Sequence, residues 1–486
     1  MKQLLIVFSF LLPLCLEAQH QLGWRTDTYA GINAALLNPA NTAQTPYAWD
    51  LNIGEANFFF ANNYAFLENS SVFSLIKQLR NEKTSFYLRD DLASDFILSE
   101  DKLVYDFNTA ASYYAQQHTS ILGPSLSVRI APMTRIGVFS RFQTMLSLKK
   151  FDGDLGYDAW SSIPDGTAFK FDAARTTIAS WSELGFNISQ GFELGDGNFY
   201  IGFNARKLDG KRAAYFINKD DFELMKIPPN TIGLEGLNFD IEAGFTNNIL
   251  VDDNFNDTAG SGWGFDLGFS YQLDDMGDYY RWEFGAAVLD IGQITFNDAQ
   301  VHRFNSDALS EAIASNYDNI VVDENFQAPA QQLSQDVFND ALASLQATEM
   351  VIHLPTTLNI QAAYHFNEWI NIKGHILTSI APDGASLSRS TTVGIIPRMD
   401  RHWWSLALPV SFYAGEQLRL GLSARLGPVF LGTDHLGSFF KQNQFTGTDI
   451  YMGVKFFPLG FNRAGKRKSH KNNKRGSGKE VKCYHF

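Results

Sequence analysis

The chain has 486 residues, of which 19% are charged and 14% aromatic, and its formal net charge is −13. Soluble globular proteins carry about 25% charged residues, so this chain is poor in charge, whereas its hydrophobic content of 45% is too high for a disordered protein. The excess of Asp and Glu argues against a nucleic-acid-binding protein, because contacts to phosphates need Lys and Arg.

The chain begins with the pattern of a secretory signal peptide. Lys2 supplies a positive start, and an apolar stretch follows as far as Leu14. Ala18 is a small residue of the kind that precedes a cleavage site. We therefore expect residues 1–18 to direct export and to be removed before Gln19.

Cys15 permits a second interpretation of this leader, as the lipidation site of a lipoprotein. Leu14 precedes it directly and is too large for that position, so cleavage after Ala18 is favoured. The chain holds only 2 cysteines, and this cleavage leaves Cys483 alone. An intrachain disulfide is then excluded, and a metal site built from cysteines is not expected.

Residues 19–46 separate the leader from the first expected strand and contain the triplet Asn38-Pro39-Ala40. Pro39 restricts Asn38 to extended conformations, and an Asn side chain readily closes a local turn. From the residues alone, two interpretations stay open. The triplet is either an ordinary turn before the first strand or part of a hatch-like segment inside a barrel.

From residue 47 onward, apolar and polar residues alternate, as in strands with one apolar face. Every second residue from Trp263 to Leu273 is apolar, and so is every second residue from Leu418 to Leu426. The polar faces carry Gly and isolated charges, unlike the Thr, Lys and Glu of a solvated sheet. The apolar faces often end in Trp, Tyr or Phe, which indicates an outward apolar band with aromatic girdles around a polar lumen.

In lipid, every backbone polar group must be paired, so a sheet is stable there only if it closes. We therefore expect an all-β protein, a transmembrane antiparallel β-barrel that spans residues 47–460, with Leu267 and Leu420 facing lipid. A soluble β-sandwich or propeller is the alternative, because its strands alternate too. Fourteen strands are expected: 47–60, 119–131, 134–148, 178–194, 198–209, 237–250, 262–273, 279–296, 354–366, 369–380, 390–398, 403–414, 417–431 and 448–457.

Two long connections, 61–118 and 297–353, are expected to be helical insertions that cap or plug the barrel. Their apolar residues at helical spacing are Val72, Leu75, Ile76 and Leu79, and Leu333, Val337, Ala341 and Leu345. The strand count places 61–118 outside the cell but 297–353 in the periplasm, with Asp274–Asp278 outside. Barrels normally have short periplasmic turns, so either the count is off by one near 209–261 or 297–353 enters the lumen from below.

The final segment, 461–486, holds nine Lys and Arg residues and one acid, Glu480. With few apolar residues, it is expected to be a disordered basic tail. The strand before it, Tyr451–Phe457, has Gly453 followed three residues later by Phe456. This pattern resembles the C-terminal signal that the barrel-assembly machinery recognises, so that machinery is an expected partner.

The segment Tyr29–Ala43 resembles the start of a family of outer-membrane barrels of unknown function. The likeness continues through Ile121–Ser125, Gly262–Gly268 and Leu422–Pro428, and it covers most of the chain except the basic tail. Asn38-Pro39-Ala40 is also similar to an N-terminal motif of the long-chain fatty-acid transporter (FadL-type) family and of barrels associated with type IX secretion. In fatty-acid transporters this motif belongs to a hatch inside the barrel, which the resemblance implies here.

No catalytic or cofactor-binding motif stands out before the basic tail: we find no nucleophile elbow, metal-binding spacing or phosphate-binding loop. We therefore expect no enzyme, no metal and no cofactor. His365 and His375 lie on neighbouring expected strands, where a hydrogen-bonding role in the lumen is favoured over a metal site. The acidic segment Asp252–Asp257 could bind calcium through its oxygens. It lacks the Gly and the closing Glu of an EF-hand loop, so a solvated turn is favoured.

Charges of both signs occur on the polar faces of the expected strands. A pore selective for one kind of ion would carry one dominant sign, so we expect ion pairs that hold plug and wall together. The lumen-facing candidates are Arg141, Arg206, Asp266, Glu283, Lys373, His375, Arg419 and Arg425.

These features predict an integral protein of the outer membrane of a Gram-negative bacterium, surrounded by membrane lipid. The expected function is passive transport of small molecules, hydrophobic ones in particular. The alternative is a scaffold or accessory barrel of a secretion or surface-assembly complex, with periplasmic or surface proteins as partners. An apolar path from the outer loops to a gap in the wall would favour transport, and a fully plugged lumen with exposed apolar loops would favour the scaffold.

Overall fold

The computed structural model describes residues 20–80, 84–92, 102–108, 110, 112–151, 166, 168–171, 173–227, 231–233, 239–250, 257–277, 279–305, 312–313 and 326–458. The expected signal peptide, Cys15 and the basic segment 461–486 lie outside these residues, as does most of the acidic segment considered for calcium. Within them, no helix is long and apolar enough to cross a bilayer.

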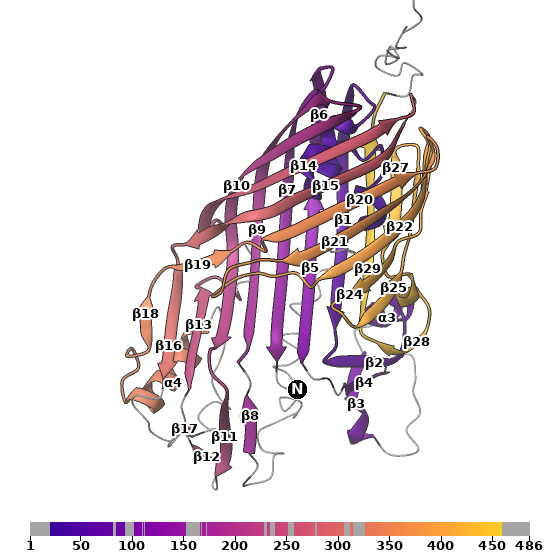
Figure 1. Cartoon of the computed structure of the whole chain (residues 1–486). Helices are drawn as coiled ribbons and strands as arrows, with labels where there is room; N and C mark the ends of the chain where they lie inside the picture. Colours follow the sequence, from indigo (N-terminus) through magenta and orange to yellow (C-terminus); the bar gives the residue numbers. More distant parts are fainter. Residues whose placement is uncertain are drawn as a thin grey trace, which may run out of the picture.

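The fold is all-β, a closed antiparallel barrel with 14 strands in its wall (Figure 1). Several wall strands consist of consecutive elements with a short break or an excursion between them. Around the wall they are β1 (Trp49–Asn62); β5 (Tyr113–Leu122) with β6 (Ser125–Ala131); β7 (Thr134–Phe151); β9 (Arg175–Leu194); β10 (Gly197–Asn218); β13 (Asp240–Thr246) with β14 (Gly260–Asp275); β15 (Tyr280–Phe296) with β16 (Ala299–Asn305); β18 (Leu345–Ala347), β19 (Met350–His353) and β20 (Thr357–His365); β21 (Ile370–Ser379); β22 (Thr392–Asp400); β23 (Trp404–Ala407) with β24 (Val410–Tyr413); β25 (Gln417–Leu420) with β26 (Leu422–Leu426); β27 (Val429–Thr433); and β29 (Gly447–Phe456).

The barrel closes between its first and last strands. Phe58 of β1 is opposite Ile450 of β29 on one side and Thr119 of β5 on the other. Closure pairs the wall strands all round, which is what a sheet in lipid requires. The expectation of a closed all-β barrel is therefore confirmed.

The expected strand number is right, but two of its parts are wrong. Segments 237–250 and 262–273 are not two wall strands, because β13 and β14 both pair with β10 and form one interrupted strand. Segment 417–431 is a hairpin of two wall strands, and Gly427, with φ +57°, makes its turn. The apolar and polar residues keep alternating through this two-residue turn, so the alternation alone does not reveal the turn.

This correction resolves the conflict over the side of 297–353. With one strand fewer near 209–261, every connection at one end of the barrel is a short turn, and every long connection lies at the other end. We call these the turn end, at the top of Figure 1, and the loop end, at its bottom. Segment 297–353 therefore lies at the loop end together with 61–118, and Asp274–Gly277 lies at the turn end.

The insertions are less helical than expected. Segment 61–118 mainly supplies a small sheet of β2 (Ala65–Ser70), β3 (Ser85–Leu88) and β4 (Lys102–Phe107), which β28 (Gln442–Phe445) joins. One helix, α3 (Val72–Leu79), follows β2, and the short helices η3 (Arg89–Asp91) and η7 (Leu436–Phe439) flank the sheet. A second small sheet contains β8 (Ala168–Phe171), β11 (Phe222–Ile227), β12 (Thr231–Gly233) and β17 (Ala312–Ile313).

The helix expected in 297–353 exists but is shorter than the apolar spacing suggested. It is α4 (Gln327–Phe338), and it contains Leu333 and Val337. Asn339 adopts a left-handed conformation with φ 56° and ends the helix. Ala341 and Leu345 therefore lie beyond it, and Leu345 begins β18.

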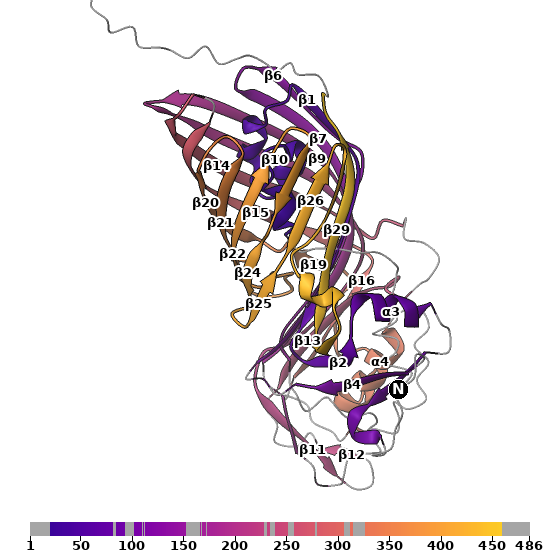
Figure 2. The same ribbon diagram turned by 90° about the vertical axis from the view of Figure 1, so that its right-hand side faces the viewer.

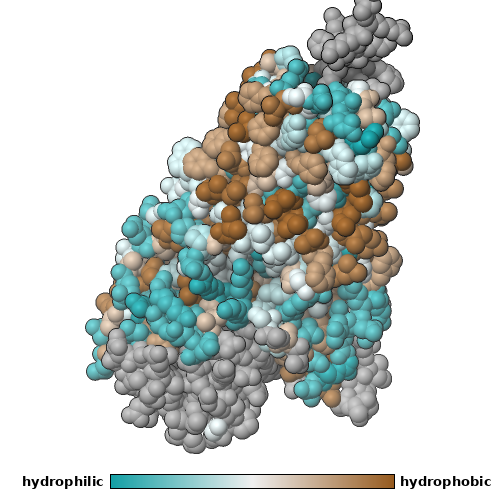
Figure 3. All heavy atoms as spheres, viewed as in Figure 1, coloured by the Kyte–Doolittle hydropathy of each residue, from teal (hydrophilic) through white to brown (hydrophobic). Residues whose placement is uncertain are grey.

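The distribution of side chains is the reverse of that in a soluble protein: apolar side chains lie on the outer surface and charged side chains on the inner surface. Leu267 and Leu420 on the outer surface are each 51% exposed, whereas the guanidinium-bearing Arg206 on the inner surface is 1% exposed. Figure 3 shows a diagonal band of apolar residues across the wall, with hydrophilic surface toward the loop end. This pattern fits an outer surface in contact with lipid and a polar lumen.

The N-terminal segment fills the turn-end half of the lumen (Figures 1 and 2). It consists of α2 (Leu22–Arg25), η1 (Gly31–Leu36) and η2 (Pro39–Gln44), and nearly all of its residues are buried. α2 packs against β22, β26 and β27, whereas η2 packs against β9, β10 and β14. We call residues 20–48 the N-terminal plug.

Candidate functional site: the plugged lumen

Successive inward-facing residues of β10 divide the lumen into three levels. Asn204 contacts the N-terminal plug, Arg206 contacts three acidic residues, and Leu208 lies in an apolar cluster. Because β10 runs from the turn end to the loop end, the plug, a charged level and an apolar level follow one another in that order.

The triplet Asn38-Pro39-Ala40 lies against glycines of the wall. The Asn38 side chain accepts a hydrogen bond from the Ala40 amide at 3.0 Å and donates one to the Phe269 carbonyl of β14 at 3.0 Å. A Cβ added at Gly202 would lie 2.2 Å from the Ala40 nitrogen, and one at Gly268 would lie 2.1 Å from Asn38 Oδ1. The glycines on these polar strand faces therefore allow the plug to approach the wall backbone.

Asparagine side chains of the wall satisfy carbonyl groups of the plug. Asn204 donates to the Ala35 carbonyl at 3.0 Å, and Asn359 donates to the Leu37 carbonyl at 2.8 Å. The short helices of the plug leave such carbonyls without partners of their own. A buried carbonyl needs a partner, so these amides fix the position of the plug.

Ion pairs also join the plug to the wall. Asp27 lies 3.2 Å from Arg425 and 3.6 Å from Arg398, and Arg25 lies 3.2 Å from Glu55 of β1. Burial raises the pKa of Asp27, but Arg425 and Arg398 outweigh it and lower that pKa to about 2. Asp27 is therefore ionised at neutral pH, which suits its two cationic partners.

A second charged contact surrounds Asp50 of β1. Its carboxylate pairs with Lys455 at 2.9 Å and with Arg135, and it accepts a hydrogen bond from the Ile32 amide of the plug at 3.0 Å. Gly31 has φ +57°, and a Cβ there would lie 2.4 Å from the Asp50 oxygens. Glycine is thus required at this position for both its backbone angle and its lack of a side chain.

At the charged level, Arg206 lies 2.6 Å from Asp266, 2.6 Å from Asp290 and 3.4 Å from Glu183. Arg141 pairs with Glu183 at 2.7 Å and Arg389 pairs with Asp290 at 2.7 Å. We call this set the charged belt: Arg141, Glu183, Arg206, Asp266, Asp290 and Arg389. It joins five wall strands, β7, β9, β10, β14 and β15, to the connection that follows β21. Its mixed signs pair internally, so it does not form a ring of one charge.

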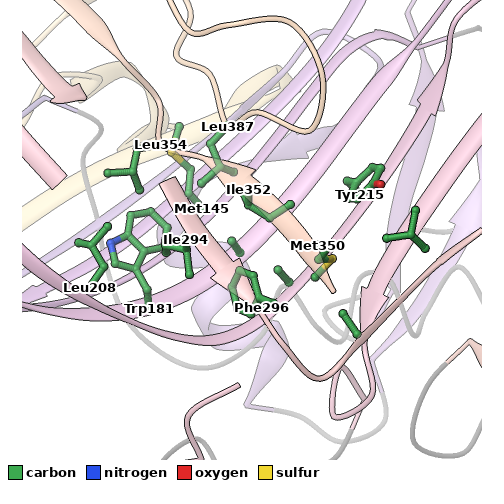
Figure 4. Packing of buried hydrophobic residues seen from close by; sticks show 14 of the residues in the cluster. Met145, Trp181, Leu208, Tyr215, Ile294, Phe296, Met350, Ile352, Leu354 and Leu387 are labelled. Atoms are coloured by element: carbon green, nitrogen blue, oxygen red, sulfur yellow. The ribbon is translucent and has the colours of Figure 1, made fainter. Parts of the chain in front are cut away.

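The third level is an apolar layer in the lumen (Figure 4). Its residues are buried and come from β7, β9, β10, β15, β16, β19, the residue that follows β19, and the connection 380–391: Met145, Ala179, Trp181, Leu208, Ala213, Tyr215, Ile217, Ile294, Phe296, Ala299, Val301, Met350, Ile352, Leu354 and Leu387. The Trp181 indole donates to Glu183 of the charged belt at 3.3 Å. The apolar layer therefore lies directly on the charged belt.

The connection 380–391 crosses from the wall into these two levels. Leu387 joins the apolar layer, and Arg389 joins the charged belt. Two backbone hydrogen bonds join the connection to His353, the last residue of β19. The Leu387 amide donates to the His353 carbonyl at 3.0 Å, and the His353 amide donates to the Ala385 carbonyl at 2.9 Å. We call residues 380–391 the lumen strap.

Two small cavities lie beside the plug in the described part of the lumen. One, of about 10 Å³, is lined by Thr26, Glu283, Lys373 and His375 among others. The second, of about 20 Å³, is lined by residues that include His20, Arg419 and Asp434. Each volume is enough for about one water molecule, so neither cavity could pass a solute.

The residues expected from the sequence to face the lumen have the following surroundings. Lys373 is half-buried, and it lines a cavity together with Glu283 and His375. His375 lies 3.2 Å from the Asn359 amide oxygen. Arg419 lies 3.8 Å over the Tyr413 ring. Arg141, Arg206 and Asp266 belong to the charged belt, and Arg425 pairs with the plug.

Sequence reasoning missed several charged residues of the lumen. Asp27 and Arg25 were not considered, because no strand pattern surrounds them. Asp290 lies within an irregularity in the pairing of β14 with β15, between Val288 and Ile291, and this irregularity breaks the alternation. Asp50 and Glu55 lie in the first expected strand but are five residues apart, so strict alternation would place them on opposite faces. A bulge between Asn52 and Gly54 brings both to the inner face. Within the described residues, no group of three or more His, Cys, Asp or Glu side chains could hold a metal ion.

Comparison with known families gives one match, to a family of unknown function, over residues 39–434. The chain belongs to the DUF5723 family. No curated protein sequence matches it. The resemblance to a barrel family of unknown function is therefore confirmed, and the family description adds no activity to it.

Solved structures similar to this DUF5723 chain include the following three. A FadL homologue of Pseudomonas aeruginosa has 10% identity and a TM-score of 0.38, and the match covers 91% of this chain and 96% of that one. The Ralstonia pickettii toluene transporter TbuX has 10% identity and a TM-score of 0.36, with 88% and 93% covered. The Pseudomonas putida toluene transporter TodX has 10% identity and a TM-score of 0.34, with 91% and 98% covered.

Proposed function

We propose that the protein is a gated outer-membrane barrel for the passive passage of small apolar molecules. The observation that carries this proposal is the apolar layer, which lines the lumen between the loop-end connections and the charged belt. A barrel that only needed to be filled could use polar side chains at this level, as it does around the plug. An apolar lining instead offers a favourable environment to an apolar solute that has left water.

Passage requires movement, because the described lumen is packed at all three levels. The apolar contacts between plug and wall form four small clusters and not one continuous interface. The other contacts are hydrogen bonds and ion pairs. Water can replace such partners when they separate, whereas a large apolar interface would be costly to open. The plug and the lumen strap are the parts that this proposal asks to move, with the turn end facing the periplasm as short turns normally do.

Uptake into vesicles with lipopolysaccharide in their outer leaflet tests this function. The probe is N-phenyl-1-naphthylamine, an apolar dye that fluoresces in lipid. We expect the full-length barrel to raise its rate of entry and Leu387→Gln to lower that rate, because an amide would lie unpaired in the apolar layer. Leu342→Gln is the matched control, since Leu342 is exposed at the loop end. Entry no faster than in vesicles without protein, with the barrel folded, would contradict the proposal.

The scaffold remains a second candidate function, because a packed lumen and exposed apolar side chains at the loop end favour it. Phe73 and Phe440 there are 66% and 65% exposed. A scaffold needs no passage through the lumen. A folded barrel that leaves dye entry unchanged and retains specific periplasmic or surface proteins would support this function instead.

A further inference from the structure

One face of α3 is exposed and combines apolar with basic residues. Ile76 and Lys77 lie three and four residues after Phe73, and Arg80 lies four and three residues after them, so all four residues share one side of the helix. Phe73 and Ile76 are 66% and 45% exposed, although Val72 on the other side is buried. The helix begins with a capping box between Ser71 and Ser74, so its start is well defined.

The short helix η7 and the residues after it extend this face. η7 packs against α3, and the rings of Phe73 and Phe439 lie 5.6 Å apart. Phe440 is 65% exposed, and Lys441 beside it is exposed too. We define the rim anchor as the exposed face formed by Phe73, Ile76, Lys77, Arg80, Phe440 and Lys441.

The rim anchor lies where the apolar band of the wall reaches the loop end of the barrel. η7 packs against β25 and β29, and Asn63, just before β2, donates to Glu416 in the turn between β24 and β25 at 3.1 Å. The residues that flank this turn on the outer surface are apolar, since Phe412 is 46% and Leu418 76% exposed. Apolar surface therefore continues from the wall toward the rim anchor.

The opposite side of the barrel shows where the lipid boundary lies. On β10 the outward residues change from Phe203 to Lys207 and Asp209, and Lys207 Nζ lies 5.4 Å from the Trp263 ring. A basic residue beside a Trp is typical of the membrane–water interface. β10 continues to Asn218, so that wall extends past the interface, whereas the wall near β25 ends at about the height of α3 (Figure 2).

We propose that the rim anchor inserts into the headgroup layer of the adjacent leaflet and binds the phosphates of its lipids. Its three apolar side chains would enter the boundary between headgroups and acyl chains, and its three cations would lie at phosphate level. The whole chain has a net charge of −13, whereas the rim anchor carries three cations beside the apolar band. Anionic lipid headgroups have the charge that complements this basic face. A helix of eight residues is too short to span a bilayer and lies along its surface instead.

Lipid-borne quenchers test this contact directly. The mature chain with Cys483→Ser carries a nitrobenzoxadiazole label at Phe73→Cys or, as a control, at Gln335→Cys, an exposed residue of α4. Both proteins are placed in nanodiscs of phosphatidylcholine that contain nitroxide lipids. We expect several-fold stronger quenching at position 73 than at 335, and weaker quenching of position 73 by iodide in water. Equal lipid quenching at the two positions would overturn the proposal.

A charge variant tests phosphate binding separately from apolar contact. Phosphatidylglycerol added to the nanodiscs should increase lipid quenching at position 73 in the parent protein. Lys77→Glu with Arg80→Glu should abolish this increase, whereas Lys150→Glu, at an exposed position near the loop end of β7, should leave it unchanged. An increase that survives in the double variant would overturn the phosphate contact.

Other occupants of this face give different results. If the label at position 73 is quenched by iodide as strongly as the label at 335, the face lies in water and the proposal is wrong. If position 73 is protected from both quenchers and the protein runs as a dimer on a non-denaturing gel, a second copy covers the face, and the proposal is equally wrong.

Discussion

Asp27 of the N-terminal plug and Arg425 of β26 are separated by 398 positions in the chain, yet Arg425 Nε donates to Asp27 Oδ2 at 3.2 Å. The contact links the first described elements to one of the last wall strands. Arg398 of β22 approaches the same carboxylate, so Asp27 joins two wall strands to the plug. Asp27 is therefore one of the side chains that fix the position of the plug.

Replacing Asp27 with Asn should loosen the plug. The change leaves Arg425 buried without its acidic partner, and breaking a buried pair in this way typically costs about 3–5 kcal/mol. We expect a lower midpoint of unfolding in guanidinium chloride and more frequent conductance steps in planar bilayers. Asp340→Asn, at an exposed loop-end position, should change neither. Unaltered conductance in a folded Asp27→Asn barrel would show that Asp27 does not hold the plug.

Acid should release the plug through the same group. Because the pKa of Asp27 is lowered from 3.8 to about 2, its contribution to stability is complete above about pH 4 and is lost as the pH falls through about 2. Conductance should therefore rise between these values. The Asp27→Asn variant has no such carboxylate, so it should show a smaller rise over this range, and an identical pH profile in both proteins would refute the assignment.

The close fit of the plug to β10 can be tested at Gly202. A Cβ at this position would lie 2.2 Å from backbone atoms of Pro39 and Ala40, so Gly202→Ala must displace the plug or the strand. Overpacking of this kind typically costs about 1–3 kcal/mol. Gly374 on β21 is the matched control, because a Cβ there meets nothing closer than 3.9 Å. Denaturation in guanidinium chloride should therefore separate the two alanine variants, and equal stability would contradict the plug position.

The barrel itself could be predicted from the sequence because alternation is a local property. A strand with one face to lipid and one to the lumen must alternate along its own length, as Trp263 to Leu273 does. The pairing partners are not local. β13 and β14 alternate like two separate strands, and only their shared pairing with β10 shows that they form one.

The sequence could show which strand residues face the lumen, but not which of them contact one another. Arg206 and Asp266 could be assigned to the inner face from their alternation with apolar residues, but their contact depends on the register of β10 and β14, in which they are offset. The plug carries no periodic pattern that would predict its place. Asparagines of distant strands hold its short helices, and these contacts cannot be read from the sequence of the plug. Gly202 and Gly268 were visible as glycines on a polar face, but the backbone that approaches them was not.

Leu267 should be sensitive to charge because of its depth in the membrane. It lies on the outer surface of β14, opposite Phe203 of β10, within the apolar band. Leu267→Arg should cost about 2–4 kcal/mol at the midplane, while Ser261→Arg should cost about 0–1 kcal/mol. Ser261 is the matched control on the same strand and surface, opposite Asp209. Equal stability of the two variants during unfolding from lipid vesicles would place Leu267 outside the membrane.

The end of the chain offers a test of where the barrel stops. β29 pairs with β27 on one side and with β1 on the other, so truncation after Thr446 removes the strand that closes the wall and leaves two unpaired edges. Phe457, just after β29, is buried and stacks on Tyr47 of the plug with ring centroids 4.6 Å apart. Truncation after Asn462 retains both β29 and this stack.

We therefore expect the chain truncated after Asn462 to assemble in the outer membrane and the chain truncated after Thr446 to fail. Assembly is measured as the difference in gel mobility between unboiled and boiled samples, because a closed barrel stays folded in detergent until it is heated. Full-length protein is the reference, and a third chain ending at Phe456 isolates the Phe457 stack. That chain should assemble but shift at a lower temperature, since its wall is complete and its plug has lost one aromatic contact. Failure of the chain that lacks only 463–486 would show that the barrel needs residues beyond Phe457.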